Sequence, residues 1–174
     1  INAFLFIISL IYKRILINWY LKHSTNTSFV IELSYKHNKI ISAFNKFTAL
    51  NQRDELDNLS KNFTLVDDLP PVNHKKYMQV LSEYKFALCP LGNGPDTHQL
   101  WEALMVYTIP VMINCNFTKN LVLNGIPVLV VDSWSEISDF TPAYLENFYK
   151  QNINKEAIDL LTSFKYWYEK IRTL

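Results

Sequence analysis

Apolar and polar positions alternate in blocks along most of the chain, and this pattern predicts an α/β fold. Short, almost wholly apolar runs predict strands at 39–44, 63–66, 85–89, 109–113 and 127–131. Apolar residues at helical spacing predict helices at 52–61, 73–82 and 116–123, a short helix after 132, and two helices within 141–174. Strands that are apolar on both faces are typical of a parallel sheet covered by helices on each side. We therefore expect a Rossmann-like, doubly wound domain with C-terminal helices.

The segment 85–113 carries the candidate site. It reads as a strand, a turn-rich loop, a helix and a second strand, and its loop holds two of the chain's three glycines, Gly92 and Gly94. Asp96 and Gln99 fit a capping box at the start of the helix. A glycine loop that leads into a helix favours an anion, because the first-turn N–H groups are unpaired. The alternative is a tight turn before a solvated helix face, because two glycines without a third are a weak signal.

Three predicted strands end in polar or turn-rich segments. The Gly92–Gly94 loop, the segment after Ile113, and Asp132 all follow such strands. On the helix, His98 and Glu102 are four residues apart and share the face opposite the apolar stripe, so one is expected to meet a phosphate and the other a sugar hydroxyl. Ligands of doubly wound sheets bind beyond the carboxyl ends of the strands. We therefore expect an anion site where these ends converge.

Composition narrows the classes of function. The chain has 174 residues, of which 49% are hydrophobic and 19% are charged, as expected for a globular domain with a buried core. The net charge is +1 and no basic run interleaves with aromatic residues, so nucleic-acid binding is not expected. Cys89 and Cys115 are interpreted as small buried hydrophobes. No residues have metal-ligand spacing, so His23, His37 and His74 are interpreted as surface residues and no metal site is predicted.

Residues 1–28 are interpreted as a hydrophobic helix and linker, separate from the domain at 29–174. The apolar runs within 3–21 are interrupted by Lys13 and Arg14. This pattern predicts a helix that packs on a domain outside the chain, and the alternative is membrane association through 3–21. The chain starts at Ile1 instead of Met, which is consistent with a fragment. The compartment stays open between the cytoplasm, a membrane surface and, for a eukaryotic secretory protein, the Golgi lumen.

Several motifs together resemble the carboxyl-terminal half of exostosin-like glycosyltransferases, in particular the branch with the ribitol xylosyltransferase domain. The motifs are a Cys-Pro, a Gly-Asn-Gly loop followed by Asp, a His, a Trp-Glu-Ala-Leu helix, an Ile-Pro-Val strand, and an apolar strand ending in Asp-x-Trp. They occur in that order in SEYKFALCPLGNGPDTHQLWEALMVYTIPVMI and NGIPVLVVDSWSEI. The resemblance covers about residues 38–138 and is strongest over 82–136.

The resemblance implies one half of a GT-B fold, in which two Rossmann-like domains face a cleft and the second holds the donor. The implied reaction transfers a sugar from a nucleoside diphosphate sugar, expected to be UDP-linked, to a hydroxyl of a glycan or another acceptor, without a metal. In such enzymes the acceptor site, and often the catalytic base, comes from the N-terminal GT-B domain. The resemblance implies that this domain is a missing partner, so it assigns no catalytic base within the chain. Glu102 matches the carboxylate that accepts hydrogen bonds from ribose hydroxyls. The implied substrate-binding residues lie in the loop and the helix after it: Gly92, Asn93, Gly94, Asp96, Thr97, His98, Gln99 and Glu102.

Three positions depart from the family pattern. Gln99 and Leu91 stand where the family usually has arginines, and Tyr107 stands where the helix usually ends in glycine, which predicts a costly left-handed cap. Because a hydrogen bond to a charged group is worth roughly 1.5–3 kcal/mol, two lost arginines would weaken donor binding strongly. Three side chains are candidate substitutes: His98, Lys85 and Lys119. A second hypothesis is therefore a catalytically degenerate partner or glycan-binding module. A dinucleotide is disfavoured, because no acid lies between residue 116 and Asp132.

Overall fold

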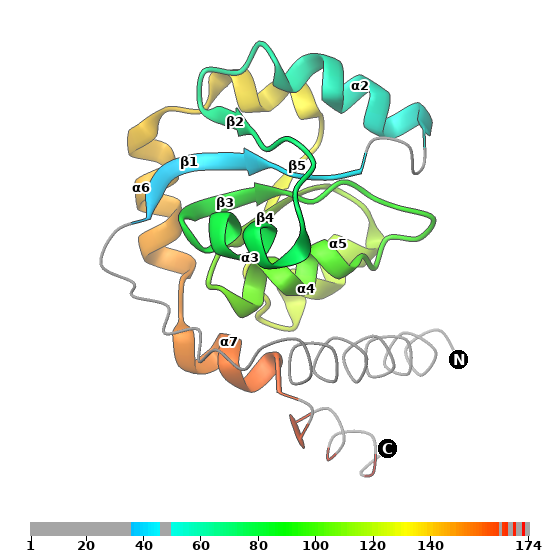
Figure 1. Cartoon of the computed structure of the whole chain (residues 1–174). Coiled ribbons are helices and arrows are strands. Elements are labelled where there is room, and N and C mark those ends of the chain that lie inside the picture. The colour runs from blue at the N-terminus through cyan, green and yellow to red at the C-terminus, as the bar shows by residue number, and fades with distance from the viewer. Residues whose placement is uncertain (1–35, 46–49, 164, 167–168, 170–171, 173–174) are drawn as a thin grey trace.

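Five parallel strands form the central sheet of the structure, a computed structural model that describes residues 36–45, 50–163, 165–166, 169 and 172 (Figure 1). The helix and linker predicted at 1–28 lie outside these residues. The strands are β1 (His37–Ser42), β2 (Val66–Asp68), β3 (Tyr84–Leu88), β4 (Ile109–Ile113) and β5 (Leu129–Val131).

The strands lie in the order β2-β1-β3-β4-β5, and every neighbouring pair is parallel. The first strand of the sheet, β1, lies in its interior; β2 is added on one side of β1, and β3, β4 and β5 build the other side. The direction of winding reverses between β1 and β3. The fold is therefore α/β and Rossmann-like, and the β1–β3 switch point is where such sheets leave a crevice for ligands.

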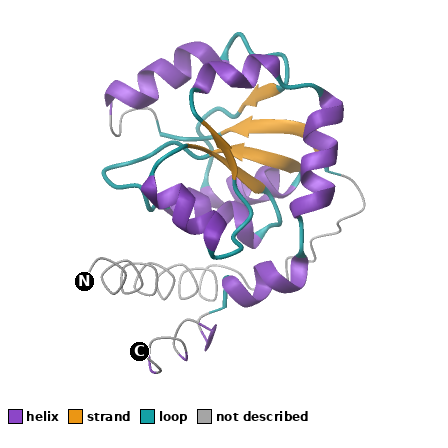
Figure 2. Cartoon of the chain, turned by 180° about the vertical axis from the view of Figure 1, so that it is seen from behind, coloured by secondary structure: helices purple, strands orange, loops and turns teal. Residues whose placement is uncertain are grey.

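Helices cover both faces of the sheet (Figure 1 and Figure 2). On one face lie α2 (Leu50–Ser60), the 3-10 helix η1 (Trp134–Asp139) and α6 (Pro142–Asn152). On the other lie α3 (His74–Ser82), α4 (His98–Met105), α5 (Asn116–Leu123) and α7 (Lys155–Leu161). Along β3 the side chains alternate between the two cores, with Phe86 and Leu88 towards α2 and Ala87 towards α4. All three are fully buried, and burial of a large apolar side chain stabilises the fold by about 1.5–3 kcal/mol.

The strand predicted at 63–66 is wrong for most of its length. Phe63 lies in the turn after α2, where Val66 N donates to Phe63 O. The Phe63 side chain is nevertheless buried in the core. The strand instead includes Asp67 and Asp68, which the sequence pattern assigned to a loop. An edge strand tolerates these acids, because Asp67 accepts hydrogen bonds from Lys39 Nζ at 2.7 Å and Tyr84 Oη at 3.0 Å.

The other predicted elements agree with the structure within a few residues. The strand at 109–113 and the helix at 116–123 match as predicted, and the C-terminal helical segment breaks at Ile153 and Asn154. The strand predicted at 39–44 begins and ends two residues earlier, and the one predicted at 127–131 begins at Leu129. No helix among the described residues is long and apolar enough to cross a bilayer.

The end of α4 has the left-handed backbone that its sequence makes costly. Tyr107 has φ of 57°, the one positive φ of a non-glycine residue in the described chain. Two interactions hold it: its hydroxyl donates to Asp159 Oδ1 at 2.9 Å, and its carbonyl accepts from Tyr149 Oη at 2.9 Å. These contacts from α6 and α7 offset part of the strain that glycine would avoid.

Candidate functional site

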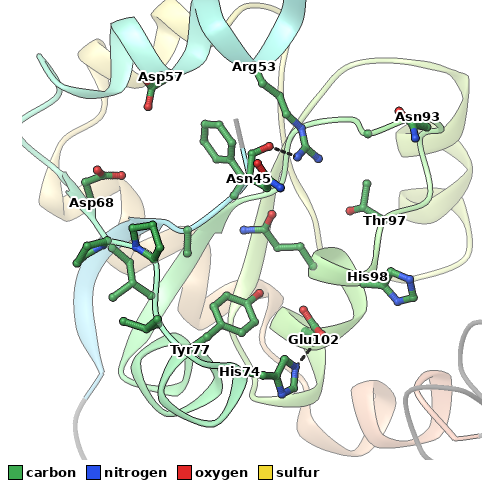
Figure 3. Close-up of a pocket in the computed structure, with 18 of the residues that line it drawn as sticks. Asn45, Arg53, Asp57, Asp68, His74, Tyr77, Asn93, Thr97, His98 and Glu102 are labelled. Atoms are coloured by element: carbon green, nitrogen blue, oxygen red, sulfur yellow. Dashed lines mark hydrogen bonds and ion pairs between the residues drawn. The ribbon is translucent and has the colours of Figure 1, made fainter. Parts of the chain in front are cut away.

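A cavity of about 970 Å³ opens at the carboxyl ends of β1, β2 and β3, beside the switch point. Its walls come from the loops after these three strands and from α2, α3 and α4 (Figure 3). The volume lies at the upper end of the range of small-molecule sites, which is roughly 300–1,000 Å³. The cavity is therefore large enough for a ligand of nucleotide size.

All eight residues proposed from the sequence line this cavity, and they come from the loop after β3 and the first turns of α4. Asn93, Gly94 and His98 are exposed at its rim, whereas the other five are half-buried. The expected convergence of three strand ends is only partly right. The segments after β4 and β5 bind each other, through Asn114 Nδ2 and Asp132 Oδ1 at 2.6 Å, and they do not line the cavity.

The predicted capping box at the start of α4 is wrong. Thr97 is the N-cap residue, and no side chain caps the helix there. Asp96 Oδ1 instead accepts a hydrogen bond from the indole Nε1 of Trp101 at 2.7 Å. Trp101 is only 5% exposed, so its N–H needs a buried acceptor, and this requirement takes the carboxylate away from the backbone.

Two donors at the start of α4 have no acceptor among the described residues. Thr97 Oγ1 and Gln99 Nε2 are both buried, and neither has a hydrogen-bond partner within the described part of the chain. Both residues line the cavity. Buried donors of this kind cost about 1–3 kcal/mol each when unsatisfied, so an acceptor from a ligand in the cavity would recover that free energy.

Glu102 lies further along α4 and is bound to α3 through His74. His74 Nε2 lies 3.1 Å from Glu102 Oε1 (Figure 3). His74 is thus a half-buried cavity residue, which corrects its interpretation as a surface residue. Beside this pair, the Tyr77 hydroxyl is buried next to the Glu102 carboxylate. Burial, and then the charge of Glu102, raise the pKa of Tyr77 well above its usual range, so the phenol is a neutral donor.

Arg53 reaches the cavity from α2, on the other face of the sheet. Its side chain is 6% exposed and donates to three backbone carbonyls: Leu91 O at 2.9 Å, Asn45 O at 2.6 Å and Pro90 O at 3.3 Å. These carbonyls belong to the loops after β1 and β3, so the guanidinium joins the two loops at the switch point. Figure 3 shows the side chain extending from α2 towards Asn45.

The remaining charges of the cavity are mostly acidic. Its lining includes four carboxylates: Asp57, Asp68, Asp96 and Glu102. Three of them have partners in the structure, namely Lys61 for Asp57 at 2.9 Å, Trp101 for Asp96, and His74 for Glu102. Asp68 is exposed at the rim. The cavity therefore offers both acceptors for hydroxyl groups and one buried cation.

Two of the three cations suggested as substitutes for the family arginines do not reach the cavity. Lys85 is bound to Glu146 on α6, and Lys119 is exposed on α5. His98 does line it, at the rim.

Sequence reasoning missed Arg53, His74 and Tyr77. Arg53 sits nearly forty residues before the glycine loop, in a helix whose pattern gives no sign of a site. The signal that could have found it is topological: α2 follows β1, and β1 is the neighbour of β3 in a doubly wound sheet.

Comparison with known proteins identifies no family. A scan against models of protein families returned no match, and a search of curated proteins returned none. No cluster of three or more His, Cys, Asp or Glu side chains suited to a metal occurs in the described residues. The exostosin-like resemblance therefore depends on the sequence motifs alone, and the site is argued from its geometry.

Proposed function

We propose that this domain binds a nucleoside diphosphate sugar, UDP-linked, and is the donor-binding half of a GT-B-type glycosyltransferase that transfers the sugar to an acceptor hydroxyl. The observation that carries the proposal is that all eight residues implied by the exostosin-like motifs line one cavity at the β1–β3 switch point. Such crevices hold nucleotides in doubly wound sheets.

The walls of the cavity differ in chemistry, and the difference suits the parts of such a donor. The loop after β2 contributes an apolar wall of Leu69, Pro70 and Val72, against which a nucleobase can pack. The α4 wall contributes Glu102, and the loop after β3 contributes small residues and unpaired donors. A ribose would lie at the carboxylate and the phosphates at the glycine loop.

Glu102 is suited to bind the ribose because a carboxylate only accepts hydrogen bonds, whereas vicinal hydroxyls donate them. His74 Nε2 contacts Oε1 of Glu102 and orients the carboxylate. In this proposal Oε2 accepts from the ribose. His74 is then a positioning residue, since it acts on the ligand through Glu102.

Calorimetric titration of UDP, with GDP as the comparison, tests the proposal. We expect Glu102→Ala to weaken UDP binding roughly tenfold to a hundredfold, the range for a hydrogen bond to a charged group. Glu55→Ala is the matched control, because Glu55 is an exposed glutamate on α2 that does not line the cavity. Equal UDP affinity of the wild type, Glu102→Ala and Glu55→Ala would contradict the assignment of Glu102.

The four cavity carboxylates favour one second candidate, a degenerate relative that binds a neutral glycan. Carboxylates repel a diphosphate but bind sugar hydroxyls well. This candidate predicts no UDP binding by the wild type and a measurable affinity for a neutral oligosaccharide that Glu102→Ala abolishes. The same titration with both ligands therefore separates the two functions.

A further inference from the structure

We infer that Arg53 forms the anion subsite of the cavity, binding a phosphoryl group in place of the arginines that positions 91 and 99 lack. The identity of the ligand as a nucleotide diphosphate rests on the proposed function. The anion subsite itself rests on the contacts of Arg53, Gly92, Thr97 and Gln99.

The guanidinium of Arg53 has hydrogen-bonding capacity left over. It carries five N–H groups, and three are used by the carbonyls of Asn45, Pro90 and Leu91. These contacts take one N–H each from Nε, Nη1 and Nη2, so Nη1 and Nη2 keep one donor each. Because the carbonyls hold the group rigidly, a phosphoryl oxygen would meet a preorganised donor.

Glycine at position 92 keeps the approach to this donor open. A Cβ at Gly92 would lie 3.4 Å from Arg53 Nη2 and 3.4 Å from Thr97 Cγ2. The missing side chain therefore leaves space between the guanidinium and the start of α4. Thr97 Oγ1 and Gln99 Nε2, which have no acceptor among the described residues, belong to the same cavity wall. An anion bound at Arg53 would therefore lie beside the wall that carries these two donors.

The charge of Arg53 meets carbonyl groups and an aromatic ring in the described part of the chain, with Cζ 5.8 Å from the centre of the Phe44 ring. No carboxylate pairs with it in the described part of the chain, although the side chain is nine-tenths buried. Burial lowers the pKa of the guanidinium below its ordinary value, as expected for a cation that lacks a counter-charge. A buried cation without a partner is costly, and an anionic ligand supplies the partner. Three of the four cavity acids are bound to other residues, namely Lys61, Trp101 and His74, and the fourth, Asp68, is exposed at the rim.

The test uses inorganic pyrophosphate, UDP and uridine, each titrated calorimetrically into the whole chain. Gly92→Ala is the decisive variant, because it keeps Arg53 and its three carbonyl contacts and fills only the space in front of Nη2. The backbone at position 92 has no positive φ, so alanine is compatible with the fold. Gly94→Ala is the steric comparison, since a Cβ there would have no heavy atom within 4 Å. We expect Gly92→Ala to weaken pyrophosphate and UDP about tenfold, and more than Gly94→Ala does.

Arg53→Lys and Arg53→Met extend the series. Lysine keeps the charge but loses the fork, and methionine loses both, so the affinity for pyrophosphate should fall in the order Arg, Lys, Met, by roughly a hundredfold in total. Lys119→Ala removes one exposed positive charge outside the cavity and controls for net charge. Uridine binding should be unchanged in every variant. Circular dichroism and thermal melting identify any variant that fails to fold, and Gly92→Ala then decides the question.

The outcomes separate the anion subsite from the nucleotide function. The anion subsite is supported if the wild type binds pyrophosphate and both Gly92→Ala and Arg53→Lys lose this binding. If, in that case, UDP binds no more tightly than pyrophosphate, the result contradicts the nucleotide proposal but not the subsite. If UDP binding depends on Glu102 but not on Gly92 or Arg53, the subsite is wrong and the nucleotide proposal stands. Wild type that binds neither pyrophosphate nor UDP overturns the subsite.

Discussion

Replacing Lys36 by methionine should change how the stability of the domain depends on pH. Lys36 lies at the amino-terminal edge of the sheet, opposite the cavity, and is 7% exposed. Its Nζ donates to Tyr84 O at 3.0 Å, Val106 O at 2.9 Å and Thr108 Oγ1 at 3.0 Å. All three acceptors are uncharged, so the ammonium is buried without a counter-ion among the described residues. Burial therefore lowers the pKa of Lys36 from 10.5 to about 7.

The sign and size of the effect follow from proton linkage. Below pH 7 both the folded and the unfolded chain hold the Lys36 proton, and stability does not depend on it. Between pH 7 and 10.5 the unfolded chain keeps the proton and the folded chain releases it, so the free energy of unfolding rises with pH. Each pH unit in this window adds about 1.4 kcal/mol, which gives a ceiling of about 5 kcal/mol. The three acceptors favour the charged form and reduce the gain below this ceiling.

Urea unfolding of the wild type and Lys36→Met at several values between about pH 6 and pH 10 measures this term. Other groups titrate in both proteins, so the difference between the two free energies of unfolding isolates Lys36. We expect the wild type to gain stability relative to Lys36→Met by several kcal/mol across the window, and no gain below pH 7. A difference that stays flat from pH 7 to 10 would refute the reasoning, because it would mean that the three acceptors hold the proton despite burial.

Two further predictions concern single side chains. Tyr107→Gly should be more stable than Tyr107→Ala by about 1 kcal/mol in urea unfolding. Both variants lose the tyrosine contacts, but only the alanine variant keeps the strain of the left-handed backbone. Equal stabilities would show that the backbone at φ of 57° is not strained. Cys89 is fully buried, and this burial raises the pKa of its thiol above the usual range. A thiol reagent should therefore label Cys115 in the native protein and Cys89 only after unfolding. Native labelling of Cys89 at the rate of Cys115 would contradict that burial.

The fold could be predicted because its strands are apolar on both faces. Runs such as 109–113 leave no solvent-facing side and are typical of a parallel sheet that is covered on both faces. The edge strand β2 was not predicted correctly, because it contains acidic residues and is not apolar on both faces. At an edge, Asp67 can be stabilised by Lys39 and Tyr84 across the sheet, and such pairing is invisible to a pattern of apolar residues along one segment.

The candidate site could be predicted where its residues are contiguous. The loop after β3 and the first turns of α4 enter the cavity together because a strand end and the following helix start are neighbours in any doubly wound sheet. The local pairings could not be predicted, because they depend on residues from other elements. Asp96 was expected to cap α4, but the buried indole of Trp101 takes its carboxylate. His74 has no metal-ligand spacing in the sequence, yet α3 brings it to Glu102.

The positive charge at an anion site can come from any element that reaches the site, and not only from the sequence motif that forms it. Gln99 and Leu91 leave the loop and the first turn of α4 without the two arginines of the family pattern, and along that segment the site has lost most of its phosphate-binding chemistry. In space, however, β1 lies next to β3, so the helix that follows β1 passes over the loop that follows β3. Arg53 uses this adjacency, and its contact with the Leu91 carbonyl places the guanidinium at the residue where the side-chain cation is missing. In the proposed subsite, glycine at 92 serves access to Arg53 and not a special backbone conformation, because its φ is not positive and a Cβ there would lie 3.4 Å from Arg53 Nη2.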